Sequence, residues 1–450
     1  MTSWKLIVED YGKIKSAEIE VAPLTLFVGD NNSGKSYLLS LLWGIKNFGV
    51  KALIGSQIVK NEQTELIQKW LREQIEIAKE KKQHTVSIEC LSNELKQILN
   101  TELEKNKDYL VRRIFNSENV NIGKLSIELG DLKEEKLCIN LNEDLAGFEF
   151  FVSGQYKILV PKEKLEEENI QDEEVFYWIL LMCIYSGILN INAIEDPRNT
   201  NIYLPAARTG FMLTKDIINK LGRKNTFNLA EEKEEIVPFI RPINQFLDIM
   251  GDLSVESLGK TENLELVHDI ENEMTNGTID FSTMPNKEVM YVPIGYKKGI
   301  PLRLASAVVS ELSPLILILK HKKFADQFFY EEPEMCLHPQ LQRKMGKVIS
   351  RIVNSGIGMV VTTHSDIMLQ HFNNMIKLAK RSDYKEICEK LGYTDLDLLN
   401  SSQIKVYQLR VKAKEKTIVE ELVCGENGFA IPTFNDALDL IMNEAYEIQE

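Results

Sequence analysis

The sequence is poor in cysteine, and its few cysteines are scattered. Six of the 450 residues are cysteine, and no two of them have the C-x-x-C spacing that is common in zinc sites. So few thiols in a chain of this length also argue against a fold held together by disulfides. We therefore expect reduced thiols and a cytoplasmic protein. The cysteines are Cys90, Cys138, Cys183, Cys336, Cys388 and Cys424.

Long hydrophobic runs are absent as well. The longest apolar stretch, residues 175–189, is about five residues shorter than a membrane-spanning helix requires, so we interpret it as a buried helix. The first residues show no charged and then apolar signal segment, and residues 4–8 have the composition of a strand. We expect no membrane association.

Basic residues are outnumbered by acidic ones. Lysine and arginine together number 53 against 67 aspartates and glutamates, which gives a formal net charge of −14. An acidic chain has no overall electrostatic attraction for the phosphates of DNA. Any contact with nucleic acid is therefore expected to be local, or to be made through a partner protein.

What is present is a complete phosphate-binding loop. Residues 29–36, Gly-Asp-Asn-Asn-Ser-Gly-Lys-Ser, fit the pattern G-x-x-x-x-G-K-[ST] at every fixed position. The apolar residues 24–28 before the loop are typical of a strand, and residues 37–43 after it are typical of a helix. This strand, loop and helix context is the one in which such a loop binds a nucleoside triphosphate.

The chemistry of the loop assigns a role to each part of it. The glycines allow the backbone to curl so that successive N–H groups and the helix N-terminus face the phosphates. Lys35 is expected to reach the β- and γ-phosphate oxygens, and the Ser36 hydroxyl is expected to ligate Mg²⁺. The predicted nucleotide-binding residues here are Gly29, Asn31, Asn32, Ser33, Gly34, Lys35, Ser36 and Tyr37.

The rest of the chain suggests one large α/β domain with insertions, because no internal repeat or low-complexity linker interrupts it. Residues 57–110 predict two amphipathic helices with a break near Thr85, and alternating segments in residues 124–160 predict a small antiparallel sheet. Residues 201–205 predict a strand, followed by charged helices to about Gly251 and a less regular stretch to about Pro285. Residues 289–304 predict a hairpin that turns at residues 297–299.

These segments give a division of the chain into four parts. We expect an N-terminal part of the nucleotide-binding domain with the phosphate loop (1–50), a helical and β insertion (51–200), a C-terminal part of the same domain (201–375) and an α/β segment that completes it (376–450).

Paired carboxylates follow a second apolar strand. Residues 327–330 form the strand, and Glu331 and Glu332 end it. A carboxylate at the end of a buried strand can hold Mg²⁺, and a neighbouring carboxylate can polarise the attacking water. We assign the metal role to Glu331 and the base role to Glu332.

A histidine ends a third apolar strand. Residues 358–366 read Gly-Met-Val-Val-Thr-Thr-His-Ser-Asp, so His364 follows the apolar run directly. Ligands of α/β folds bind at the carboxyl ends of the strands, where an imidazole can hydrogen-bond a γ-phosphate. We therefore add His364 to Lys35 and Glu332 as a predicted catalytic residue.

The phosphate loop, the Glu-Glu-Pro-Glu-x-x-Leu-His-Pro segment (331–339) and Thr-Thr-His-Ser (362–365) occur in that order. This set resembles the ABC-type ATPase heads of the OLD-like AAA group, which are related to SMC and RecF ATPases and occur in bacterial anti-phage systems. The resemblance implies an α/β ATPase head with a mixed central sheet, an antiparallel β-subdomain and a helical insertion, and ATP and Mg²⁺ as cofactors.

In such families two heads enclose two ATP molecules, and a signature segment of one head completes the site of the other. The matching segment is residues 304–312, where the resemblance gives Ser306 the contact with the γ-phosphate of the other copy. This segment lacks glycine, and Glu331 stands where ABC heads more commonly have aspartate. No clear glutamine loop is found; Arg208, in residues 204–208, either approaches the phosphates or the dimer interface, or forms a surface salt bridge.

A built-in nuclease is not expected. The acidic pair Asp395 and Asp397 is better explained as the start of a helix capped by Thr394, because no second set of carboxylates accompanies it. Residues 404–450 predict two strands, 404–409 and 417–423, and a final amphipathic helix from Thr433. The resemblance then implies a stand-alone ATPase subunit.

Three functions remain open at this point. The first is an ATPase that forms a homodimer or a higher homo-oligomer around ATP and regulates a separately encoded effector, a nuclease or toxin, in anti-phage defence. The second is an ATP-stabilised scaffold or inhibitor with little turnover, which the glycine-free signature favours. The third is a RecF-like repair ATPase that acts on DNA directly, which the acidic net charge disfavours.

Overall fold

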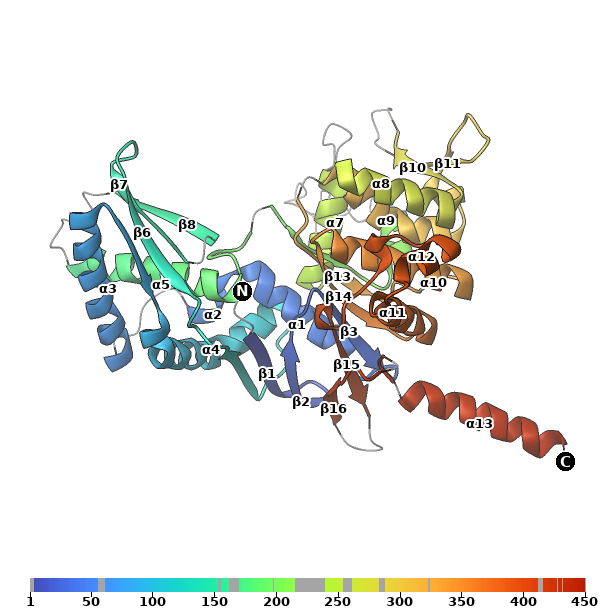
Figure 1. Ribbon diagram of the computed structural model, residues 1–450, viewed down its shortest axis with the longest axis horizontal. Coiled ribbons are helices and arrows are strands. Elements are labelled where there is room, and N and C mark those ends of the chain that lie inside the picture. Colours follow the sequence, from blue (N-terminus) through green and yellow to red (C-terminus); the bar gives the residue numbers. More distant parts are fainter. Residues whose placement is uncertain are drawn as a thin grey trace, which may run out of the picture. The chain divides into compact units, whose positions relative to one another are not determined.

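The computed structural model divides into two compact units, which are described separately here (Figure 1). Unit 1 comprises Met1–Val21, Leu41–Pro197 and Lys416–Ile418, and unit 2 comprises Ala22–Ser40, Arg198–Glu415 and Val419–Glu450. The structure describes residues 4–55, 61–152, 155–161, 170–196, 198–214, 239–253, 261–282, 288–322, 324–411, 416–426, 428–430 and 432–449.

Unit 2 is built on parallel strands. Every residue of β3 and of β13 is buried, which is the pattern of strands covered on both faces. The hydrogen-bonded order is β15 (Ile404–Arg410), β3 (Leu24–Gly29), β14 (Gly358–Thr363), β13 (Gln327–Glu331) and β9 (Asn201–Leu204). Because these strands are parallel, their carboxyl ends meet at one edge of the sheet.

Helices cover the unit 2 strands and share one hydrophobic core with them. The described helices of unit 2 include α7 (Arg241–Asp252), α8 (Thr261–Ile270), α9 (Ala307–His321), α10 (Pro339–Asn354), α11 (Asp366–Ala379), α12 (Tyr384–Leu391) and α13 (Pro432–Gln449). Residues 208–214 are helical as well. The helix α9 shows why the core forms here, because almost all of its residues from Val309 onward are buried and residues 314–319 are all apolar.

A small antiparallel sheet completes unit 2. Its order is β10 (Gly277–Phe281), β11 (Val289–Pro293) and β12 (Ile300–Pro301), so the predicted hairpin is confirmed. The prediction of an irregular stretch before residue 285 is wrong where the structure describes it, because α8 and β10 lie there. The charged helices expected between residues 215 and 238 lie outside the described residues, and α7 forms after them.

Unit 1 contains two antiparallel arrangements of strands. In the first, β1 (Trp4–Tyr11) pairs with β2 (Ile14–Glu20) and with β5 (Lys124–Leu129). The second is a four-stranded sheet in the order β4 (Gln83–Ser87), β6 (Lys136–Asn142), β7 (Gly147–Val152) and β8 (Gln155–Pro161). We expected residues 124–129 in the small sheet, which is wrong, because β5 pairs with β1 instead.

The helices of unit 1 follow the sequence pattern. Its helices are α2 (Val50–Ile54), α3 (Glu62–Lys81), α4 (Ser92–Phe115) and α5 (Ile170–Leu189), while α1 (Lys35–Phe48) begins in unit 2 and ends in unit 1. The two predicted amphipathic helices are confirmed as α3 and α4, and the break near Thr85 is the strand β4. Among the described helices, α5 included, none combines the length and the apolar character needed to cross a membrane.

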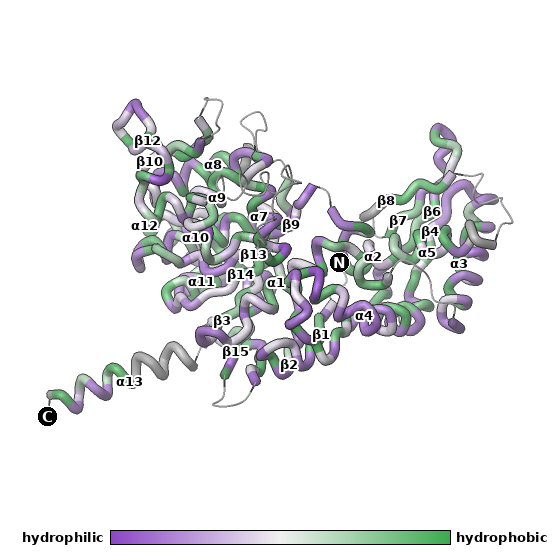
Figure 2. Tube along the Cα trace, turned by 180° about the vertical axis from the view of Figure 1, so that it is seen from behind, coloured by the Kyte–Doolittle hydropathy of each residue, from purple (hydrophilic) through white to green (hydrophobic). Residues whose placement is uncertain are grey.

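The predicted fold class is therefore confirmed at the level of its elements. The described part of the chain is α/β, with a mixed sheet, two separate antiparallel sheets and helices between residues 51 and 200. The C-terminal strands and helix are also as predicted, namely β15, β16 (Thr417–Leu422) and α13. Figure 2 shows apolar and polar residues interleaved along the end of α13 that is drawn in colour.

Candidate active site

The predicted nucleotide site lies at the carboxyl edge of the unit 2 strands. The phosphate loop leaves β3 at Gly29, and α1 begins at Lys35. Three residues of the loop have positive φ, namely Gly29 at 140°, Asn32 at 60° and Gly34 at 101°. A backbone that alternates in this way turns successive N–H groups to one side, which forms a concave binding site for an anion.

Gly29 cannot carry a side chain in this position. A Cβ added there would lie 2.3 Å from the carbonyl oxygen of Leu409 in the neighbouring strand β15. Backbone atoms of a paired strand cannot move aside cheaply. The first glycine of the motif is therefore required by close packing as well as by its φ angle.

The side chain of Lys35 is buried against the backbone of the phosphate loop. Its Nζ donates to the carbonyl oxygens of Gly29 at 3.0 Å and Asp30 at 2.7 Å, and to the Ser33 hydroxyl at 3.4 Å. These acceptors carry no net charge. A phosphate group therefore fits this site, because it would supply the negative charge that a buried ammonium favours.

The pKa of Lys35 shows the same need for an anion. Burial lowers this pKa from 10.5 to about 8, because the charged form is disfavoured away from water. The nearby carboxylates of Glu332, Asp30 and Glu334 act in the opposite direction but do not cancel the effect of burial.

The other residues of the phosphate loop differ in their exposure to solvent. Asn31, Asn32, Ser36 and Tyr37 are exposed, whereas Ser33 is buried. The Ser36 hydroxyl stands at the first turn of α1, which is where the motif requires a metal ligand.

The strand register brings the three predicted strand ends together. Glu331 in β13 is level with Thr362 in β14, and Thr363 of β14 is level with Val28 of β3. His364 therefore follows a strand that lies between the strand of the phosphate loop and the strand of the paired carboxylates. The buried strands predicted before Glu331 and before His364 are confirmed.

Glu331 and Glu332 differ in their surroundings. Glu331 is buried, and its Oε2 accepts a hydrogen bond of 2.9 Å from the backbone N–H of Ala206. Glu332 has a φ of 41°, a strained value for a residue with a side chain, and its N–H donates to the carbonyl oxygen of Thr362 at 2.9 Å. Its side chain is about one third exposed. The two neighbouring carboxylates thus differ in exposure.

The metal-binding role of Ser36 and Glu331 stays a prediction. Among the described residues, no group of three or more His, Cys, Asp and Glu side chains could hold a metal ion. This fits Mg²⁺, which is commonly bound by one or two protein oxygens together with phosphates and water. Ser36 and Glu331 are the residues of this chain that would hold it.

His364 contacts the predicted base. Its Nε2 lies 3.7 Å from Oε1 of Glu332, and both residues border Lys35. Burial lowers the pKa of His364 below its usual value, and the positive charge of Lys35 lowers it further. The imidazole is therefore neutral at pH 7, and one of its ring nitrogens can donate a hydrogen bond.

Glu334 is a residue that the sequence interpretation missed. Its Oε1 accepts a hydrogen bond of 2.5 Å from the backbone N–H of His364, and burial raises its pKa. It also contributes to the field at Lys35. The available signal was its place in the acidic run after β13, two residues beyond Glu332.

Ser306 lies where the sequence predicts a helix start. It is the N-cap of α9 and is exposed, and its hydroxyl makes no capping hydrogen bond within the helix. Its predicted contact with a nucleotide bound to a second copy stays a prediction. Glu311, which lies in the same signature segment, is buried and was not singled out.

Arg208 is not the surface residue that one interpretation of the sequence expected, while its predicted approach to the phosphates or to the dimer interface stays a prediction. Its side chain is completely buried and forms an ion pair with Glu311, so the surface salt bridge is wrong. Its guanidinium points away from solvent, toward the carbonyl oxygens of Pro205, Glu331 and Glu332. In this structure Arg208 thus lies behind the carboxylates, where it supports their backbone.

The acidic pair near residue 395 is structural. The described turn Asp395–Asp397 is a short 3-10 helix, and Thr394 and Asp397 form a capping box. Asp397 is fully buried and pairs with Arg351 at 2.6 Å. The predicted helix start at Thr394 is confirmed.

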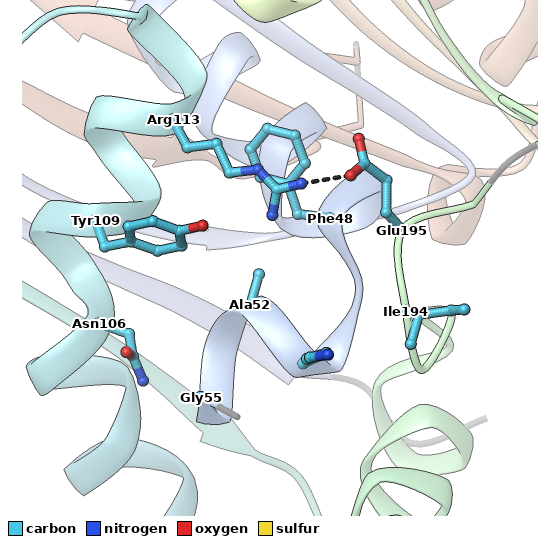
Figure 3. Close-up of a pocket in the computed structure, with 9 residues that line it drawn as sticks. Phe48, Ala52, Gly55, Asn106, Tyr109, Arg113, Ile194 and Glu195 are labelled. Carbon is cyan, nitrogen blue, oxygen red and sulfur yellow. Dashed lines mark hydrogen bonds and ion pairs between the residues drawn. The ribbon is translucent and has the colours of Figure 1, made fainter. Parts of the chain in front are cut away.

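Unit 1 holds a cavity of its own, away from the phosphate loop in sequence. It measures about 590 Å³. Figure 3 shows the Arg113 guanidinium against the Phe48 ring, with their centres 4.1 Å apart, and in an ion pair with Glu195. Glu195 neutralises Arg113, and Lys51 is the other charged residue of the lining.

The comparison with protein families identifies the class. The sequence description of the AAA ATPase domain family matches residues 1–369. The match covers most of the chain, and the chain therefore belongs to this family. It is accordingly an ATP-binding domain of the ATPase class. A comparison with curated proteins finds no match.

Among solved structures, the chain is similar to heads of SMC proteins. One is an SMC head bound to the C-terminal winged-helix domain of ScpA, with 13% identity, a TM-score of 0.37, and 93% of this chain and 96% of that chain covered. A second, bound to the C-terminal domain of ScpA from Pyrococcus furiosus, has 14% identity, a TM-score of 0.37 and complete coverage of both chains. The SMC head of Thermotoga maritima has 11% identity, a TM-score of 0.34, and 94% and 100% coverage.

Proposed function

We propose that the chain is an ABC-type ATPase subunit of the OLD-like group that hydrolyses ATP with Mg²⁺. The observation that carries this proposal is the 3.7 Å approach of Glu332 to His364 beside the buried Lys35. A base, a neutral imidazole and a buried cation are the groups that phosphoryl transfer to water needs.

Each residue has a separate task in this proposal. The loop N–H groups and Lys35 bind the phosphates, and Ser36 and Glu331 hold the metal. Bound Mg²⁺ neutralises negative charge on the phosphate oxygens. Glu332 takes a proton from the attacking water, and His364 hydrogen-bonds the transferred phosphoryl group.

We further propose that the site is completed by a second copy of the chain. Ser306 supports this part of the proposal, because an exposed serine at the N-terminus of α9 presents a hydroxyl and unpaired backbone N–H groups to an approaching anion. ATP would then favour the closed dimer, and the population of that state would regulate a separately encoded effector in anti-phage defence. Any nucleic acid would be contacted through that partner.

The variant Glu332→Gln tests the chemical part. It keeps the size and shape of the side chain but removes the base, so we expect the turnover rate to fall by at least about 100-fold. ATP affinity should be retained, and a dimer should accumulate with ATP in light scattering. Glu389→Gln, at an exposed position of α12, is the matched control and should hydrolyse ATP like the wild type. Unchanged turnover in Glu332→Gln would contradict the role of Glu332.

The defence role needs a test in cells. The gene and its neighbours would be expressed together, and phage plating efficiency would be compared between the wild type and Glu332→Gln. We expect protection with the wild type and its loss, or constitutive toxicity, with the variant. Equal plating with and without the genes would contradict the defence role while leaving the ATPase activity intact.

A scaffold with little turnover is the second candidate. The specific observation in its favour is the glycine-free start of α9, where Ala307 and Val308 follow Ser306. ATP binding at micromolar affinity with no measurable phosphate release from the wild type would favour this function.

A further inference from the structure

The buried side chain of Arg208 joins three segments of unit 2. Its Nη1 donates to the carbonyl oxygens of Pro205 at 2.9 Å and Glu331 at 2.5 Å. Its Nη2 donates to the carbonyl oxygen of Glu332 at 3.1 Å and forms the ion pair with Glu311. The guanidinium also lies over the ring of Tyr330, 4.6 Å from its centre.

The contacts of Arg208 lie at the end of β13, where the backbone leaves the sheet. Glu331 is the last residue of the strand, and Glu332 turns away with its positive φ. A residue held at a strained φ keeps that conformation only when its surroundings impose it. The carbonyl oxygens that Arg208 binds are those of the predicted metal ligand and the predicted base themselves.

Glu311 connects this arrangement to α9. It lies in the second turn of the helix whose N-cap is Ser306, and it is as completely buried as Arg208. The Thr209 hydroxyl donates to its Oε2 at 2.6 Å, which adds a second link between the two chain segments. Removing one partner of a buried ion pair leaves an unpaired charge, so α9 cannot move without disturbing Arg208.

We infer that Arg208 and Glu311 are positioning residues that couple the start of α9 to the geometry of Glu331 and Glu332. Displacement of α9, on which Ser306 stands, is transmitted through Glu311 and Arg208 to the backbone of the two carboxylates. This inference rests on the proposed function for its catalytic consequence but not for the coupling itself, which the free protein already contains.

The kinetic test uses Arg208→Lys and Thr209→Val. Lysine keeps the charge but cannot bind several carbonyls in a fixed plane, and valine removes the hydroxyl link to Glu311 while leaving the ion pair. We expect kcat to fall by about 10- to 100-fold with KM changed by less than about 3-fold, because misplacing catalytic groups reduces the rate more than binding.

The control is a second arginine–carboxylate pair of unit 2. Arg351 pairs with Asp397 at 2.6 Å, and Asp397 is completely buried. Among the described residues, the further polar partners of these two side chains are Asp269 and Thr394, neither of which belongs to β13. Arg351→Lys should lower the melting temperature without changing kcat. An equal fall of kcat in this variant would mean that Arg208 acts only through stability.

A second measurement does not need turnover. Hydrogen exchange of the amides in residues 327–335 would be compared between the wild type, Thr209→Val, Glu311→Gln and Asp397→Asn, all without ATP. We expect the Glu332 amide to exchange faster in Thr209→Val and Glu311→Gln than in the wild type. In Asp397→Asn the exchange of this amide should not change.

The outcomes separate the inference from the proposed function. If the wild type hydrolyses ATP, unchanged kcat in Arg208→Lys and Thr209→Val together with unchanged exchange in Thr209→Val and Glu311→Gln would overturn the coupling and leave the ATPase proposal in place. A wild type that binds but does not hydrolyse ATP would overturn the ATPase proposal, and the exchange data alone would then decide whether α9 and the carboxylates are coupled.

Discussion

At the scale of single residues, Gly29 gives the sharpest steric prediction. We expect Gly29→Ala to destabilise the protein by about 2–4 kcal/mol, because its Cβ would meet the Leu409 carbonyl oxygen at 2.3 Å and its φ of 140° is unfavourable for alanine. Urea unfolding measures the change. Gly251→Ala in α7 is the control: nothing lies within 4 Å of its added Cβ, and the helix should gain about 0.5–1 kcal/mol.

Lys35 gives a prediction in pH. Its pKa in the folded protein is about 8, so the ammonium loses its proton as the pH rises through that value, and ATP affinity should fall above it. The Lys35→Arg variant remains protonated, so its weaker ATP affinity should not change between pH 7 and 9.5. Calorimetric titration with ATP measures both. A flat wild-type profile would contradict the lowered pKa.

The lowered pKa of Lys35 affects stability in the opposite direction to ATP affinity. Between about pH 8 and the ordinary pKa of 10.5, the unfolded chain keeps a proton that folded Lys35 has lost. The contribution of this group to the free energy of unfolding therefore increases with pH in that window.

At the scale of elements, the sequence predicts local features better than pairings. The strands β3, β13 and β14 were predictable because each is a short apolar run that ends in a polar motif. The partner of β5 was not, since an alternating pattern indicates a strand but not the sheet it joins. Arg208 and Glu311 were misjudged or missed for a related reason: each is buried only because the other, distant in sequence, neutralises it.

The helix α13 gives a prediction about stability, because its described side chains are not packed against the rest of the protein. Residues 440–448 are all exposed, and Ile448 retains 83% of its accessible surface. Ile448→Ser should therefore change the free energy of unfolding by less than about 0.5 kcal/mol. Ile376→Ser in α11, where the side chain is 1% exposed, should cost several kcal/mol. Thermal unfolding compares the two, and a large effect at Ile448 would mean that α13 is packed in solution.

At the scale of the whole molecule, the decisive question is whether one site uses residues of two copies. The phosphate loop and Ser306 belong to the same chain, so the two arrangements differ in what happens when variants are mixed. Lys35→Met disables the phosphate loop and Ser306→Arg disables the start of α9, and each alone should abolish hydrolysis.

If the sites form between copies, a dimer of one Lys35→Met chain and one Ser306→Arg chain retains one intact site. Random pairing of an equal mixture places half of the dimers in this state, so about a quarter of wild-type activity should return. If each chain hydrolyses ATP with its own residues alone, every site in the mixture carries a defect and no activity returns. Phosphate release from the mixture, measured against each variant alone at the same total concentration, distinguishes the two, because only a site shared between copies allows one inactive chain to complement another.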